Sequence, residues 1–443
     1  MNYARRIVGN TAIVLTIKVV GVFSVLLTNA TLARMLTQEE FGVYFLCVSV
    51  VMFFVILARF GQRQAIVRLV SEAIATGSDY KIISITISAM KISLLGSLLI
   101  LLLGLFRIDV YLANILQTNV IVELSLLLFI WVFLLALETP SVEVLRGIDK
   151  IGYASIFDGV LSQILLAFCL ILLVMSNISI SLRQAVEISV IVVSISIVVA
   201  ALVLYFNLKD YTYKKNSYVL NLLSISMPLL LVNLTVYILN NSGIWLSGIF
   251  LNQQSVALYG AAWKFVSVLL FPLMIANLAI QPIVVHLNTT KKIKTLEKVL
   301  RGTATLLAIP ALLASVILIT FREELLILLY GDDYIDSAQV FLILTIGQLV
   351  NVLTGQSSIV LGLCGHQNAL MYVSIISGII GIALSSILVN SYGIIGIAIG
   401  VSIGLALSNI ISLYLVHRYI GIKIYASINP VFVKEAIDRL KSK

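Results

Sequence analysis

The chain has 443 residues, of which 60% are hydrophobic and 11% are charged, and its formal net charge is +9. Soluble domains carry about 25% charged residues, so this composition excludes a soluble globular protein. The positive charges are spread over many short polar segments, so they do not indicate a nucleic-acid-binding surface, and no nucleic-acid partner is expected.

Long apolar segments recur along the chain, and each could cross the hydrocarbon core of a bilayer as a helix. The first, Thr11–Ala33, is too long for the apolar region of a cleavable signal peptide, so it is predicted to be the first span. In chain order, the predicted spans are centred at Val20, Val51, Leu95, Ile130, Leu165, Ser194, Leu231, Val268, Ala311, Leu349, Ile379 and Ile403. The sequence therefore predicts an all-α polytopic membrane protein with about twelve transmembrane helices.

The Lys and Arg residues between the predicted spans lie mostly in alternate segments. If the N-terminus is cytoplasmic, the outer loops hold only Arg34, Arg107, Arg183 and Arg322. Cytoplasmic loops of membrane proteins carry the excess of positive charge, so both termini are predicted to be cytoplasmic. Residues 425–443 are predicted to form a basic tail, either as a short helix on the anionic cytoplasmic surface of the membrane or as a solvated segment.

Two pairs of matching segments indicate an internal repeat. Gln38–Tyr44 aligns with Gln253–Tyr259 at an offset of 215 residues, and Leu145–Lys150 aligns with Leu363–Asn368 at an offset of 218. Two six-span repeats of equal orientation are a common transporter plan, in which the substrate path lies between the repeats. The sequence predicts an N-terminal six-helix lobe at residues 1–207 and a C-terminal six-helix lobe at residues 208–424.

Four segments carry a family resemblance: Pro140–Lys150, Met227–Asn233, Leu328–Tyr334 and Tyr392–Ala398. They are similar to hallmarks of the Wzx-type polysaccharide flippases of the MOP exporter superfamily, in colinear order over nearly the whole chain. The resemblance implies a multi-pass protein of the bacterial cytoplasmic (inner) membrane. It implies that undecaprenyl-pyrophosphate-linked units of O-antigen, capsule or exopolysaccharide move to the outer leaflet by alternating access. It also suggests a glycan polymerase and a chain-length regulator of the same pathway as partners.

A pyrophosphate group needs cations along its path, and four candidates lie within or beside the spans. Lys18 lies within the first span and Lys264 early in the eighth, whereas Lys91 and Arg59 lie in the third span and at the inner end of the second. A lysine at the bilayer centre costs roughly 2.5–3.5 kcal/mol on insertion scales, so a wet cavity would favour it. The alternative is that each side chain snorkels to the interface or pairs locally.

Polar residues in three spans are candidates for the lining of a sugar path. They are Asn29 in the first span, Ser226, Asn233, Tyr237 and Asn240 in the seventh, and Gln348 and Asn351 in the tenth. Amides and aromatic rings suit sugars through hydrogen bonds and ring-face packing. The alternative is hydrogen bonding between helices, worth roughly 0.6 kcal/mol per pair. At the offset of 215 residues, Asn233 is equivalent to Lys18.

Two acidic residues lie near the inner ends of spans, Glu138 in the fourth and Asp158 in the fifth. Each could pair with Arg146 or Lys150 in the intervening segment, and the alternative is coupling of transport to an ion. The sequence leaves H⁺, Na⁺ and the membrane potential open as driving forces. It contains no phosphate-binding loop for ATP, and no metal or other cofactor is expected.

Three other functions share parts of this pattern. A MATE-type multidrug exporter would favour buried carboxylates for organic cations, whereas the charges in the middle of these spans are lysines. A flippase for the peptidoglycan precursor lipid II is a second alternative, although the motifs favour the oligosaccharide branch. A membrane glycan polymerase or acyltransferase needs a catalytic grouping, and His286, His366 and His417 are isolated, so no enzyme activity is expected. The expected partners are the lipid-linked oligosaccharide and the surrounding membrane lipids.

Overall fold

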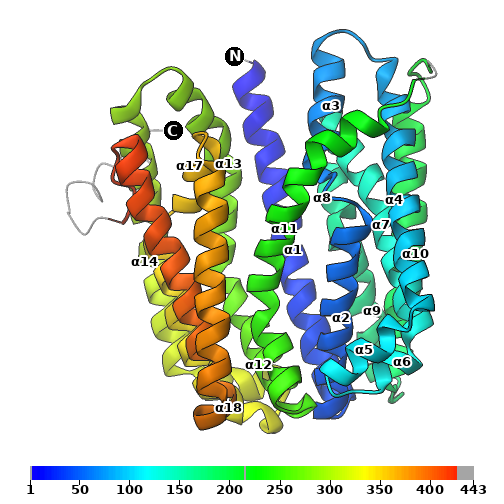
Figure 1. Cartoon of the computed structure of the whole chain (residues 1–443), viewed down its shortest axis with the longest axis vertical. Coiled ribbons are helices and arrows are strands. Elements are labelled where there is room, and N and C mark those ends of the chain that lie inside the picture. Colours follow the sequence, from blue (N-terminus) through cyan, green and yellow to red (C-terminus); the bar gives the residue numbers. More distant parts are fainter. Residues whose placement is uncertain (1, 214–215, 427–443) are drawn as a thin grey trace. The chain divides into compact units, whose positions relative to one another are not determined.

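The computed structural model describes residues 2–213 and 216–426, and all regular structure in these ranges is helical. Packing divides the chain into two compact units, Met1–Ala257 and Leu258–Lys443. Figure 1 shows long helices running side by side within each unit. The predicted all-helical class is confirmed for the described residues.

The first unit contains the elements that will position the candidate site. They are α1 (Asn2–Met35), α2 (Gln38–Ala58), α3 (Arg63–Ala75), α4 (Lys81–Leu105), α5 (Ile108–Ile115), α6 (Val120–Glu123), α7 (Ser125–Gly147), α8 (Ile151–Ser155), the π-helical turn η1 (Ile156–Val160), α9 (Leu161–Met175), α10 (Leu182–Leu208) and α11 (Val219–Phe250). The next helix, α12 (Gln253–Val266), begins in the first unit and ends in the second.

The second unit continues from α12. It contains the 3₁₀ turn η2 (Ser267–Leu270), α13 (Phe271–Thr289), α14 (Ile293–Thr320), α15 (Arg322–Tyr330), the 3₁₀ turn η3 (Asp332–Ser337), α16 (Ala338–Leu353), α17 (Ser357–Leu363) and α18 (Gln367–Ile420). The chain after α18 returns to the core of this unit. There Ile422 and Ile424 are fully buried, and the amide of Ala426 donates to the carbonyl of Leu353 at 3.2 Å.

The last helix, α18, has 54 residues and bends back at Gly393, where φ is 54° and ψ is −135°. Its two arms pack on each other, since Ser385 Oγ donates to the carbonyl of Ile397 at 3.1 Å and Gly381 lies against Gly404. Each arm is long enough to cross a membrane, because a spanning helix needs about 20 residues. The eleven candidate spans among the described residues therefore provide twelve crossing segments, as the sequence predicts.

Two long spans begin at side-chain caps that the sequence encodes. Thr37 and Glu40 form a capping box at the start of α2, and Ser181 and Gln184 form one at the start of α10. Each box satisfies backbone N–H groups that the first helical turn leaves unpaired. These capping boxes fix where the two apolar helices begin.

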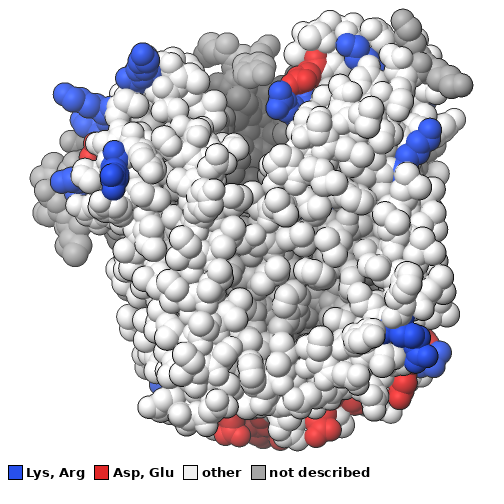
Figure 2. Space-filling view, in the orientation of Figure 1, with Lys and Arg blue, Asp and Glu red and all other residues white. Residues whose placement is uncertain are grey.

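Charged side chains are segregated from the apolar middle of the spans. On the visible face in Figure 2, Lys, Arg, Asp and Glu lie mostly at the two ends of the helices, and the middle is almost free of them. This distribution matches a hydrocarbon layer around the middle of the helices.

The first compact unit extends beyond residue 207 and includes α11, which packs against α2, α3 and α4. Gly61 takes a φ of +67° and lies against the backbone of Leu230 in α11, so only a residue without a side chain fits there. The division into six-helix lobes at residues 207 and 208 stays a prediction. Of the predicted tail 425–443, residues 427–443 lie outside the described part of the chain.

Candidate functional site

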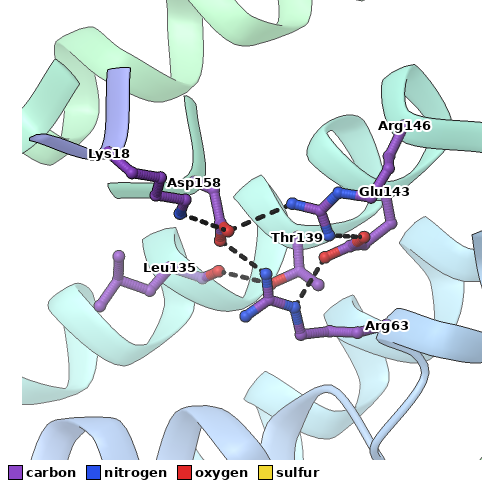
Figure 3. A network of polar contacts seen from close by, with 7 residues as sticks. All are labelled: Lys18, Arg63, Leu135, Thr139, Glu143, Arg146 and Asp158. Carbon is purple, nitrogen blue, oxygen red and sulfur yellow. Dashed lines mark hydrogen bonds and ion pairs between the residues drawn. The ribbon is translucent and has the colours of Figure 1, made fainter. Parts of the chain in front are cut away.

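Five charged side chains from four elements of the first unit meet in one cluster. They are Lys18 of α1, Arg63 of α3, Glu143 and Arg146 of α7, and Asp158 of η1, and we call them the charged cluster. Figure 3 shows Lys18, Arg63 and Arg146 approaching Asp158 from different sides, with Glu143 between the two arginines.

Hydrogen bonds and ion pairs connect the whole cluster. Arg63 donates from Nε to Glu143 Oε1 and from Nη2 to Asp158 Oδ1, both at 2.6 Å. Arg146 donates from Nη1 to Glu143 Oε2 and, at 3.2 Å, from Nη2 to Asp158 Oδ2. Lys18 Nζ completes it at 3.4 Å from Asp158 Oδ2. Each carboxylate therefore bridges the two guanidinium groups, and Asp158 also holds the lysine.

A tight turn between α2 and α3 places Arg63. Phe60 and Gly61 both take left-handed conformations, with φ values of 47° and 67°, and redirect the chain. The fully buried Gln62 then anchors the turn to α4, donating from Nε2 to the carbonyl of Ala89 at 3.2 Å and to Ser93 Oγ at 2.6 Å. Because Arg63 is the first residue of α3, this anchored turn fixes its direction toward α7 and η1.

A break in the fifth span places Asp158. The helix is interrupted at η1, where Asp158 has a ψ of 53° and Gly159 a φ of +83°. Glycine adopts this left-handed conformation without steric cost, so it permits the kink. The α1 helix packs against α8, η1 and α9, which brings Lys18 alongside the kink.

Exposure differs between the two carboxylates of the cluster. The side chain of Glu143 is 1% exposed, whereas that of Asp158 is 25% exposed. The three cations are also partly open, at 23% for Lys18, 33% for Arg63 and 29% for Arg146. Glu143 is thus the buried carboxylate that holds both arginines in place. Asp158 is the carboxylate that is accessible enough for an anionic ligand to compete with it for the three cations.

Positive charge exceeds negative charge at this site. The cluster holds three cations and two carboxylates, and Arg59, at the end of α2, lies near enough to interact with Arg63, Glu143 and Asp158. Burial, and then the adjacent charge of Arg63, lowers the pKa of Arg59 to about 10, so it stays protonated at neutral pH. Burial opposes the charge of Arg63, but Asp158 and then Glu143 outweigh it and raise the pKa of Arg63.

The four predicted cations differ in their surroundings. Lys18 is a member of the charged cluster and Arg59 is its half-buried neighbour. Lys91 is exposed on α4, and Lys264 is half-buried in the second unit, on α12; the described residues of its own unit give neither of them an ion pair. A wet cavity around these lysines stays a prediction.

The seven predicted lining residues do not form one uniform surface. Asn29, Ser226 and Gln348 are buried, Asn233, Tyr237 and Asn351 are half-buried, and Asn240 is exposed. Several bond within their own helix, as Asn29 does to the carbonyl of Val25 at 2.6 Å and Asn240 to that of Val236 at 2.9 Å. Tyr237 crosses to α2, donating to the carbonyl of Ser49 at 2.7 Å, and Asn351 donates to Gln348 at 3.2 Å. Their role as a sugar path stays a prediction.

Of the two predicted acids, one pairs with arginine and one does not. Asp158 bonds to Arg146, as expected for a structural ion pair, but Glu138 accepts a hydrogen bond from Ser196 Oγ at 2.7 Å. Sequence reasoning overlooked Arg63 and Glu143 because both looked like ordinary charges at the cytoplasmic ends of spans. The three-residue spacing of Glu143 and Arg146 on one helix face is a signal that could have found Glu143, but no local pattern marks Arg63.

Comparisons with known proteins identify the family of the chain. A family model described as polysaccharide biosynthesis protein matches residues 7–288, and one described as MatE matches residues 228–387. The probable low-salt glycan biosynthesis flippase Agl15 of Haloferax volcanii is 25% identical to this chain over 406 residues, covering 88% of the chain and 79% of that relative.

Solved structures show the same fold at low sequence identity. An inward-facing multidrug resistance MATE family transporter of the MOP superfamily superposes with a TM-score of 0.76 at 16% identity, covering 93% of this chain and 98% of that one. The lipid II flippase MurJ, in an inward closed conformation, has a TM-score of 0.71 at 16% identity, covering 98% of this chain and 92% of that one.

Proposed function

Because the chain belongs to the polysaccharide biosynthesis protein family and has the fold of MOP-superfamily transporters, we propose that it is a flippase for pyrophosphate-linked oligosaccharide lipids. The proposed substrate is an undecaprenyl-pyrophosphate-linked repeat unit of O-antigen, capsule or exopolysaccharide. The proposed direction is from the cytoplasmic to the outer leaflet of a bacterial inner membrane, by alternating access. No bond of the substrate is broken in this process.

The charge balance of the cluster is the observation that carries the proposal. A pyrophosphate that links a lipid to a sugar has two negative charges. The cluster together with Arg59 has four cations and two carboxylates, which leaves a surplus of two positive charges. Guanidinium groups bind phosphate oxygens in pairs, and a lysine supplies a compact charge. The site therefore offers the charge and the donors that a pyrophosphate diester requires.

Three charges of the cluster are not repeated in the second half of the chain. At the repeat offsets, Lys18 corresponds to Asn233, Glu143 to Leu361 and Arg146 to Cys364. The second half thus carries no charge at the positions equivalent to these three. This asymmetry supports a single phosphate site, placed in the first unit.

We propose that Asp158 is an internal competitor of the substrate for the cations of the cluster. It holds Lys18, Arg63 and Arg146 when no pyrophosphate is present, and it is the more exposed of the two carboxylates. An entering phosphate would replace it on the same donors, and its return would help to release the phosphate. Competition of this kind allows binding that is specific without being irreversible.

Two alternatives compete with this proposal. The surplus of positive charge disfavours the organic cations that MATE-type exporters carry. Lipid II also contains an undecaprenyl pyrophosphate, so the cluster alone would accept it. The match to the polysaccharide biosynthesis model over residues 7–288 favours the oligosaccharide substrate.

The proposed orientation places the cluster where the substrate loads. Arg63 begins the helix that follows the second span, and Glu143 and Arg146 lie at the end of the fourth. These ends are cytoplasmic if both termini are cytoplasmic. Single cysteines at Gly77 and Asn114, at opposite ends of the first unit's spans, should be labelled from the cytoplasm and from outside, respectively. Labelling of Gly77→Cys from outside would reverse the orientation.

Deletion of the protein in its host should trap the lipid-linked oligosaccharide on the cytoplasmic leaflet and remove the surface glycan. Lipid extraction followed by glycan analysis measures the accumulation, and expression of the wild-type chain should reverse it. The proposed polymerase and chain-length partners would then lack substrate on the outer side. Normal surface glycan in a strain without a second flippase would contradict the proposal.

A further inference from the structure

Glu138 is a buried carboxyl group of the first unit that the charged cluster does not use. It lies within the span formed by α7 and is 6% exposed. Its Oε1 accepts a hydrogen bond from Ser196 Oγ of α10 at 2.7 Å. Among the described residues, no Lys, Arg or His forms an ion pair with it. A buried carboxylate within a membrane span normally needs a cationic partner, and an ionised Glu138 would lack one.

Asp158 provides the contrast within the same unit. It faces three cations at 2.6 to 3.4 Å and is 25% exposed, so its negative charge is compensated. A compensated carboxylate has no need of a proton, whereas an uncompensated buried one is relieved by binding one. Of the two acids, Glu138 is therefore the one suited to exchange a proton.

The elements packed against α7 bring no counter-charge to Glu138. On α10, the titratable residues nearest to Ser196 are Glu187 and Tyr205, each nine residues away, or about 13 Å along a helix. The titratable residues of the other packed elements are Glu39, Glu40, Tyr44 and Cys47 on α2, Arg63, Arg68 and Glu72 on α3, Lys81 and Lys91 on α4, Glu123 on α6, Tyr153 on α8 and Asp158 on η1. Asp158 among them is a negative charge, and on α7 itself Glu143 and Arg146 lie five and eight residues from Glu138, or about 7 and 12 Å along the helix.

We propose that Glu138 is a proton-binding site that takes up a proton when a pyrophosphate diester occupies the charged cluster. This inference rests on the proposed function of that cluster. An arriving phosphate places two negative charges beside Lys18, Arg63 and Arg146 and frees Asp158 from them. The potential at Glu138 becomes more negative, which favours its neutral, protonated form.

The coupling is reciprocal. If pyrophosphate binding favours the proton on Glu138, the proton on Glu138 must tighten pyrophosphate binding by the same factor. Protonation removes one negative charge near the cluster, so the direction agrees with simple electrostatics. The reaction is balanced, since one carboxylate and one proton give one carboxylic acid, and no other reactant is needed.

The test measures protons and binding together. Purified wild-type protein in nanodiscs is titrated with farnesyl-diphospho-N-acetylglucosamine, a diester whose phosphates have no proton that titrates near neutrality. A pH indicator in weak buffer should report net proton uptake, at most one per ligand bound. Affinity should rise about fivefold or more from about pH 8 to pH 6. The near-isosteric Glu138→Gln variant should bind the ligand with no Glu138-dependent uptake and with an affinity that is flat over this range.

The Ser196→Ala variant keeps the carboxyl group and removes its hydrogen-bond donor. It should still take up a proton, but with a different dependence on pH, which a purely structural role of Glu138 would not produce. Proton uptake by Glu138→Gln equal to wild type, or ligand binding by wild type without uptake, would overturn the proton site and leave the flippase proposal intact. Absence of ligand binding by the wild-type protein would overturn the phosphate site and, with it, this inference.

Discussion

Replacement of Arg63 by alanine is expected to lower the free energy of unfolding by about 2–4 kcal/mol and to abolish export. Arg63 donates to both carboxylates of the cluster at 2.6 Å, and the side chain of Glu143 is 1% exposed. Loss of one partner of a buried charge leaves that charge uncompensated, which costs several kcal/mol; Arg146 remains as a second partner and moderates the loss. Equilibrium unfolding in mixed micelles measures the change.

Arg68→Ala is the matched control for this prediction, because it removes the same side chain from the same helix. Arg68 pairs with Glu72 on the surface, where the two side chains are 65% and 54% exposed. Such a pair is worth about 0.5 kcal/mol or less. Combining Arg63→Ala with Glu143→Gln should restore part of the stability, because the uncompensated charge is removed. Equal stability of the Arg63→Ala and Arg68→Ala variants would refute a structural role for the cluster.

Lys18→Ala and Asp158→Asn are expected to change the affinity for a pyrophosphate diester in opposite directions. Lys18→Ala removes a charge-assisted contact to phosphate and should weaken binding about tenfold to a hundredfold. Asp158→Asn removes the internal competitor for Lys18, Arg63 and Arg146 and should tighten binding. The tighter complex should also release its ligand more slowly, so both variants should export less than the wild-type protein.

Binding of farnesyl-diphospho-N-acetylglucosamine to each purified variant measures these effects, with export in the deletion strain as the second measurement. Lys18→Arg should retain part of the activity because it keeps the charge, and Lys18→Glu should be worse than Lys18→Ala because it adds repulsion. Lys81→Ala, at the half-buried first residue of α4, removes the same charge outside the cluster and serves as the control. If Asp158→Asn weakened binding as much as Lys18→Ala, competition between Asp158 and the substrate would be ruled out.

The spans could be predicted from the sequence because each depends on a local apolar run. The eleventh and twelfth spans illustrate this, because two separate apolar runs predicted them and they correspond to the two arms of α18 on either side of Gly393. The compact units were less predictable. Whether α11 packs with the elements before it or after it depends on contacts such as Gly61 against Leu230, which a repeat offset does not contain.

The candidate site was only partly predictable, for a physical reason. Lys18 was identified by its depth in a span and Asp158 by its position near Arg146, but their ion pair joins residues 140 apart in the sequence. Arg63 reaches Glu143 and Asp158 across 80 and 95 residues, through a turn whose left-handed Phe60 gives no sequence signal. Hydrophobic pattern locates a helix, but the packing of several helices decides which of its charges meet.

Reconstitution of the purified protein tests the central claim most directly. Proteoliposomes are prepared with a lectin-detectable undecaprenyl-pyrophosphate-linked oligosaccharide, and the fraction accessible from outside is followed with time. The wild-type protein should make the inner-leaflet pool accessible far faster than protein-free liposomes or the Lys18→Ala variant do. A wild-type rate no higher than that of protein-free liposomes, with folded protein present, would contradict the assignment of this chain as a flippase for pyrophosphate-linked glycans.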